Sequence, residues 1–141
     1  MSLATTRTYF KARMTGLGYE EWEDGFNFDN IPENIIDKAF HIENIVANKI
    51  DMNHTDIHLM VDVNLRVFFK GYQSIREALD LIDDDIEDIL IEVLRPSNRL
   101  IGADGLRDIQ LDGFRKLPIA SNDNSVIVEM NWKARVVLVY C

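Results

Sequence analysis

Several histidine and acidic residues are close enough in the sequence to be tested as metal ligands. His54 and His58 are four residues apart, which places two ligands on one face of a helix, but His58 lies in a segment of strand-like alternation. The segment 51–56 resembles the start of an EF-hand loop, but it has no glycine at loop position 6 and no glutamate at position 12. No metal site is therefore predicted.

The acidic run Asp83-Asp84-Asp85 lies in a predicted helix, where consecutive side chains point about 100° apart. Three such carboxylates do not converge on one cation, so the run is interpreted as a solvated helix face. Gly16-Leu17-Gly18 and Gly102-Ala103-Asp104-Gly105 lack the further residues of a phosphate-binding loop. Neither pattern predicts a bound ligand.

Nucleophilic catalysis has no support in the sequence. Cys141 is the only cysteine and the last residue, which excludes an intrachain disulfide, and no histidine is near it in the sequence. No serine lies in a strand–turn–helix nucleophile elbow. We therefore expect no catalytic residue, no metal and no cofactor, and a protein that is not an enzyme.

Two long segments carry the clearest structural pattern. Ile57–Lys70 and Val126–Tyr140 alternate apolar and polar residues, which predicts two half-buried strands. Strands of about fourteen residues span roughly 45 Å, well beyond the usual five or six residues. Their length is a first indication that the chain joins other subunits.

The remaining elements complete an α+β pattern. A helix is predicted from Ser74, where Ser74 and Glu77 form a capping box, to just before Pro96, and another over Leu3–Thr15. Shorter strands are predicted near Lys38–Glu43 and over Asp108–Leu117, the latter bulged at Gly113. We expect a single domain, residues 1–141, with a mainly antiparallel sheet, two long strands and two helices packed on one face.

Composition limits the class of partner. The net charge is −9 at pH 7, with no cluster of basic residues to grip nucleic acid. Apolar residues make up 47% of the chain, yet no apolar run approaches the roughly 18 residues needed to cross a bilayer. No secretory signal is visible at the N-terminus. We expect neither membrane insertion nor specific DNA binding.

Two groups of residues are candidate partner contacts. Trp22, Phe26 and Phe28 lie in an acidic, irregular stretch, where they either cover an end of the sheet or anchor a partner. Arg95, Arg99 and Arg107 surround a second irregular stretch and complement the acidic surface of another copy.

Three segments carry a resemblance to a known family. Asp29–Glu43 resembles the segment that leads into the first strand of small phage neck and tail proteins, and Arg99–Gly102 and Val126–Met130 add to it. The order of elements resembles that of the tail terminator (tail completion) proteins of long-tailed bacteriophages, which are related to tail-to-head joining proteins. None of these segments is a catalytic signature.

The resemblance implies a virion structural protein of the tail or neck, assembled in the host cytoplasm. It implies a homohexameric ring that ends the tail tube, binds the tail tube protein and a head completion or connector protein, and lets DNA pass through its lumen without specific binding. Three alternatives stay open: a neck, tail-to-head joining or minor tail subunit; a non-viral interaction module; and a small enzyme acting on an anionic or nucleotide substrate.

Overall fold

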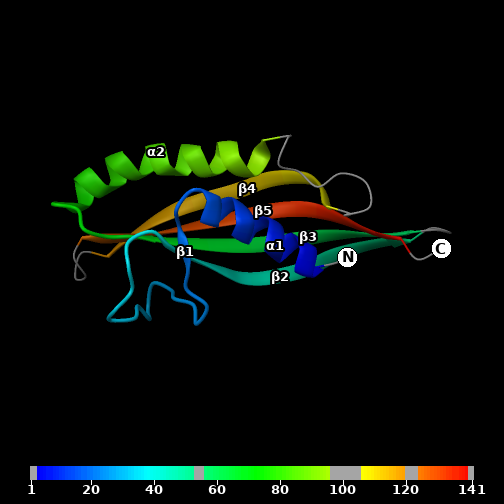
Figure 1. Cartoon of the computed structure of the whole chain (residues 1–141), viewed down its shortest axis with the longest axis horizontal. Helices are drawn as coiled ribbons and strands as arrows, with labels where there is room; N and C mark the ends of the chain where they lie inside the picture. Colours follow the sequence, from blue (N-terminus) through cyan, green and yellow to red (C-terminus); the bar gives the residue numbers. More distant parts are fainter. Residues whose placement is uncertain (1–2, 53–55, 96–105, 120–123, 140–141) are drawn as a thin grey trace.

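Two helices and five strands make up the part of the chain that the structure describes. The computed structural model describes residues 3–52, 56–95, 106–119 and 124–139 (Figure 1). In chain order the elements are α1 (Leu3–Gly16), β1 (Glu20–Glu21), β2 (Ala39–Met52), β3 (Asp56–Phe69), α2 (Ile75–Leu94), β4 (Leu106–Ile119) and β5 (Ser125–Val139).

The two strands of strongest alternation, β3 and β5, are the central pair of the sheet. The strand order is β1-β2-β3-β5-β4, and β3 pairs with β5 along its whole length, with Val63 opposite Trp132. Their length is therefore used inside the chain, where each strand stabilises the other. One edge strand of the sheet is β4. On the other side β2 is the last long strand, and the two-residue strand β1 pairs with it in parallel. The inference that the two long strands offer edges to other subunits is wrong.

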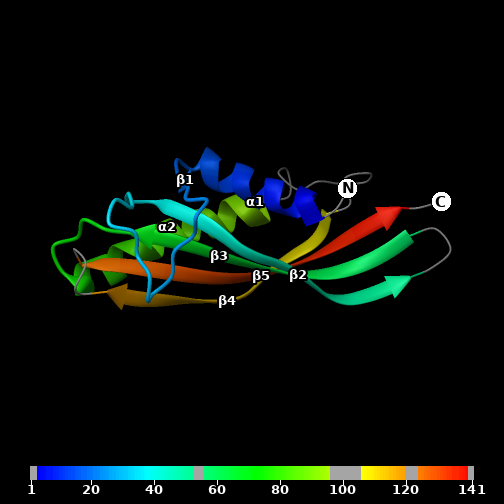
Figure 2. The same ribbon diagram turned by 90° about the horizontal axis from the view of Figure 1, so that it is seen from below.

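Both helices lie on one face of the sheet, as Figures 1 and 2 show. The alternating positions of β3 and β5 that face the helices are buried, among them Val63 and Trp132. The helices contribute Phe10 and Met14 from α1 and Ile82 from α2 to the same core. The predicted α+β class, with a mainly antiparallel sheet and two helices on one face, is confirmed.

A second, smaller core lies on the opposite face. The irregular segment between β1 and β2 folds beneath one end of the sheet (Figure 2). There it buries Phe26 and Ile35 against Phe68 of β3 and Ile127 of β5. One end of the sheet is thus covered on both faces, and this is why Ile127 and its neighbours in β5 are all buried.

The strand β2 is more than twice as long as the predicted segment Lys38–Glu43. It pairs with β3 as far as Met52, with register shifts between Ile42 and Asn44 and between Ala47 and Lys49. Each shift breaks the alternation of side chains, so period two does not continue through the strand. The predicted bulge at Gly113 of β4 is found, because the register with β5 shifts between Leu111 and Gly113.

Candidate interaction surface

The described residues offer little for metal or membrane chemistry. Among residues 3–52, 56–95, 106–119 and 124–139, no group of three or more His, Cys, Asp or Glu side chains is arranged to hold a metal ion. No helix in that part of the chain is both long and apolar enough to cross a bilayer.

The open face of the sheet carries a chain of ion pairs, which we call the cross-strand ion ladder: Glu43, Arg66, Glu129 and Arg115, one residue on each of β2, β3, β5 and β4. Arg66 Nη1 lies 3.2 Å from Glu43 Oε2, and Arg115 Nη2 lies 2.7 Å from Glu129 Oε1. Two acids and two arginines neutralise one another, so the ladder leaves no excess charge to attract a ligand. It holds the strands together.

The three aromatic residues predicted as partner contacts divide between core and surface. Phe26 is buried in the second core, and Trp22 is partly buried against it. Phe28 is 51% exposed at a tight turn, where Asn27 Oδ1 accepts hydrogen bonds from the backbone N–H of Asp29 and Asn30. The covering role therefore holds for Phe26, while a partner contact stays a prediction for Phe28.

Arg95, of the three predicted arginines, lies apart from these aromatic residues. Arg95 is exposed at the end of α2, on the helix side of the sheet, whereas the aromatic segment lies beneath the opposite face (Figure 1). Arg107 lies in β4 opposite Arg135 of β5. Arg99 falls outside the described residues. Arg95 lies beside an apolar groove on α2.

The helix α2 is fixed firmly at its first turns. Ser74 is its N-cap, and the Ser74 Oγ accepts a hydrogen bond from the Glu77 N–H at 3.1 Å, as the capping box predicts. Asn124 Nδ2 donates to the carbonyls of Tyr72 and Gln73, just before the helix. Lys116 of β4 reaches up to the Leu79 carbonyl at 3.1 Å. These contacts tie α2 to the β4–β5 hairpin.

The last turn of α2 is fixed by α1. The Tyr9 hydroxyl donates to the Val93 carbonyl at 2.6 Å, which satisfies one of the carbonyls that a helix end leaves open. Arg13 Nη1 lies 3.9 Å from Glu92 Oε1 and its guanidinium stacks over the Tyr9 ring. The C-terminal half of α2 is therefore held in one position, with its outer surface exposed.

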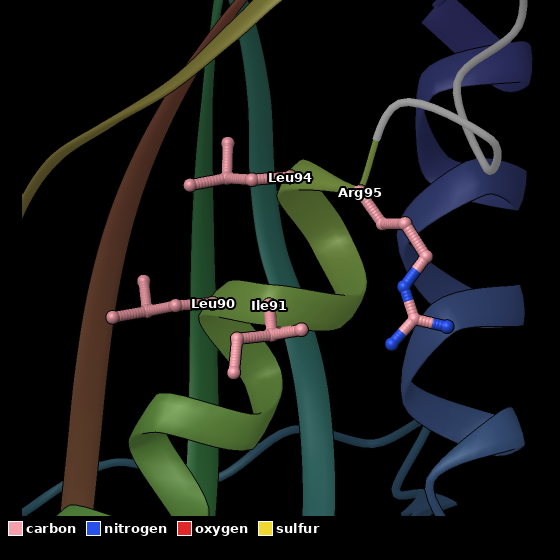
Figure 3. Close-up of a pocket in the computed structure, with 4 residues that line it drawn as sticks. All are labelled: Leu90, Ile91, Leu94 and Arg95. Atoms are coloured by element: carbon pink, nitrogen blue, oxygen red, sulfur yellow. The ribbon is translucent and has the colours of Figure 1, made fainter.

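That outer surface contains an apolar groove of about 420 Å³, lined by Leu90, Ile91, Leu94 and Arg95. Leu90 and Leu94 point to one side of α2, and Arg95 points to the other, toward α1 (Figure 3). Ile91 follows the buried Ile89 by two residues, which is about 200° around the helix, and is 58% exposed. We call these four residues the α2 groove.

The other exposed apolar residue of α2 has a different setting. Leu81 is 49% exposed, but the hollow beside it is lined by Ser74, Arg76, Glu77 and Asp80. A single apolar side chain among polar ones is ordinary protein surface. Ile91 differs from Leu81 because two further apolar side chains, Leu90 and Leu94, lie beside it, partly buried against the main core. The signal in the sequence is Ile91, an apolar residue outside the buried stripe of the helix.

The N-terminal half of α2 lies over a group of tyrosines and acids. Burial raises the pKa of Tyr72 to about 12, and the carboxylates of Asp37 and Asp85 add to this. Burial likewise raises the pKa of Tyr19, with Asp85 and Asp88 contributing. Both hydroxyls therefore stay protonated at neutral pH.

Comparison with known proteins gives slight structural likeness. No family model matches the chain, and no curated protein sequence matches it. The core region of PilO from the type IV pilus system of Pseudomonas aeruginosa is similar with a TM-score of 0.34 and 17% identity, over 72% of this chain and 79% of that one. The type 4 fimbrial biogenesis protein PilO from Pseudomonas aeruginosa has the same TM-score, 16% identity, and coverage of 72% and 58%.

The comparisons correct the expectation of a phage protein. The structures found are those of a pilus biogenesis protein, not of tail terminator, neck or tail-to-head joining proteins. The tail terminator resemblance is therefore wrong, and with it the homohexameric ring, the tail tube and connector partners, the DNA lumen and the location in a virion. A TM-score of 0.34 is too low to transfer a function from PilO to this chain. A functional proposal must therefore rest on the chain's own surface.

Proposed function

We propose that this chain is a non-viral protein-interaction module that binds a partner protein at the α2 groove, and that it is not an enzyme. The observation that carries the proposal is the exposure of Ile91 beside Leu90 and Leu94, on a helix whose other outward positions are mostly charged. Leu90 and Leu94 are partly buried where they pack against the main core, so Ile91 continues an apolar surface outward from the core. An apolar surface of this kind, rimmed by charged residues, is typical of a protein contact.

The shape of the α2 groove favours a protein over a small molecule. Its four lining residues all come from one stretch of one helix, so the groove is open and does not enclose a ligand. Small-molecule sites bury most of their ligand between several elements. Leu90 and Leu94, four residues apart on a helix that α1 holds in place, form a rigid ridge against which a partner can pack.

Site-specific photo-crosslinking tests the proposal. A photoreactive amino acid placed at Ile91 in cells that carry the gene is expected to give one defined adduct with a second protein, identified by mass spectrometry. The matched control is the same amino acid at Leu81, which has similar exposure on the same helix. We expect little adduct from position 81.

The adduct must also depend on the groove itself. An excess of the unmodified chain is expected to compete the adduct away, whereas the same excess of chain carrying Ile91→Ser is not, because that chain lacks the apolar contact. Equal adducts from positions 91 and 81, or none from either, would contradict the proposal.

A further inference from the structure

Acidic residues border the α2 groove on its N-terminal side. Glu87 is four residues before Ile91 and three before Leu90, so its side chain is their neighbour on the helix surface. Asp84 lies three residues before Glu87, one turn further along. Both are exposed, and neither forms an ion pair with any residue in the described ranges. Asp83, by contrast, is paired with Lys116.

The single basic residue of the groove does not balance this charge. Arg95 is already close to an acid, with its Nη1 3.9 Å from Glu92 Oε2. The two acids beside the groove add to a chain whose net charge is −9. A partner segment that covers Ile91 therefore meets uncompensated negative charge at one end of its apolar contact.

We propose that the α2 groove binds an amphipathic helix whose apolar face is flanked by Lys or Arg residues. This inference rests on the proposed interaction function and specifies the chemistry of the partner. The apolar residues of the partner helix pack on Leu90, Ile91 and Leu94, and its basic residues lie beside Glu87 and Asp84. This is recognition of a helix by an apolar groove with complementary charge at the rim.

Two features of the chain argue against other occupants. Extension of the sheet at the neighbouring edge is hindered, because β4 has two register shifts and Pro118, which lacks an N–H to donate. A second copy packed through the same helix would bring two acidic α2 surfaces together, which costs free energy by repulsion between like charges. A basic helix meets neither obstacle.

Synthetic peptides provide the direct test. Three peptides of about 18 residues, long enough to become helical, would share the same leucine face and carry Lys, Gln or Glu on the flanks. Binding to the full chain would be measured by fluorescence anisotropy at low and at high salt. We expect the Lys peptide to bind at least about tenfold more tightly than the Gln peptide at low salt, and the Glu peptide most weakly.

Variants then locate the binding. Ile91→Ser is expected to weaken the Lys peptide at least about tenfold, while Leu81→Ser leaves it within about twofold. The double variant Asp84→Asn and Glu87→Gln is expected to remove most of the preference for Lys over Gln. The charge control is Glu33→Gln, which removes one exposed acid from the segment between β1 and β2, on the opposite side of the sheet from α2, and is expected to keep most of that preference.

The possible results separate the two proposals. If the Lys and Gln peptides bind equally and Ile91→Ser weakens both, the basic chemistry is wrong and the interaction function stands. If the Lys peptide binds but Ile91→Ser does not weaken it, or if no peptide binds, the inference is overturned. The crosslinking from position 91 then decides the proposed function by itself. Sedimentation of the chain alone identifies self-association, which would replace the basic helix with a second copy.

Discussion

Arg66 Nε lies 3.3 Å from Glu129 Oε2, and the two residues face each other on the central strands β3 and β5. Glu129 is only 9% exposed and is also bound by Arg115 of the edge strand. The cross-strand ion ladder therefore depends on this one carboxylate, which joins three strands. A charged hydrogen bond of this kind stabilises a fold by about 1.5–3 kcal/mol.

We expect Glu129→Gln to lower the free energy of unfolding by about 2 kcal/mol, because it removes a buried carboxylate that pairs with both Arg66 and Arg115 and leaves Arg66 with Glu43 alone. The matched variant is Arg115→Gln, which removes an exposed partner of the same carboxylate and should cost less than about 1 kcal/mol. Urea unfolding measures both. Equal losses would show that the ladder acts only as a surface ion pair.

Two phenylalanines in the segment between β1 and β2 differ in burial, and only one of them belongs to the second core. Phe26 is buried and packs edge-to-face on Phe68, with ring centroids 5.9 Å apart, whereas Phe28 is 51% exposed. Phe26→Ala should lower the free energy of unfolding by about 3–5 kcal/mol, and Phe28→Ala by less than about 0.5 kcal/mol. Denaturant unfolding checks the contrast, and a small loss for Phe26→Ala would refute the second core.

The N-cap of α2 gives a local test. Ser74→Ala removes the acceptor for the Glu77 N–H and should cost about 1 kcal/mol of unfolding free energy. Ser74→Asp keeps an acceptor at the same place and should retain most of the wild-type stability. If both variants lose the same amount, the cap bond is not what stabilises this end of the helix.

The raised pKa of Asp85 predicts that the free energy of unfolding depends on pH. Burial raises the pKa of its carboxyl above the usual 3.8; Lys38 opposes this, and Asp88 and Asp37 add to it. The folded chain therefore holds this proton more tightly than the unfolded chain. The resulting stabilisation is complete below pH 3.8 and is lost as the pH rises through the raised pKa. Asp85→Asn should gain stability relative to wild type as the pH rises above 3.8 and through the raised pKa.

The variant Lys38→Gln is the companion to this measurement. It removes the cation that lowers the pKa of Asp85, so the loss of stability with rising pH should extend to higher pH than in the wild type. Urea unfolding at several pH values follows both variants. A stability difference between Asp85→Asn and wild type that stays constant across the range would contradict the role given to Asp85.

The sequence predicted the elements whose pattern is regular and local. The alternation of β3 and β5, the N-cap hydrogen bond at Ser74 and the bulge at Gly113 all depend on residues close together in the chain, and the structure confirms them. The length of β2 was missed, because its register shifts break the alternation. The pairing of the two long strands with each other depends on contacts between distant segments, which period alone does not reveal.

The surfaces were harder to predict. Phe68 and Ile127 fall on the polar side of their strands, and these two exceptions indicate that something covers the open face there. Phe26 supplies that cover, which removes it from the predicted partner contacts. The α2 groove was missed except for Arg95. Whether Ile91 is exposed depends on how α2 rests on the sheet, and that is a tertiary property.

The proposed docking of a partner at the α2 groove depends most on Ile91, and one measurement tests it directly. The protein that crosslinks at position 91 would be quantified after co-purification with Ile91→Ser and Leu81→Ser chains. Both changes lie at exposed positions and should leave the unfolding free energy within about 0.5 kcal/mol of wild type. We predict that Ile91→Ser reduces the recovered partner at least about tenfold and Leu81→Ser less than about twofold. Equal recovery with the two variants would contradict the proposal that the α2 groove is the docking surface.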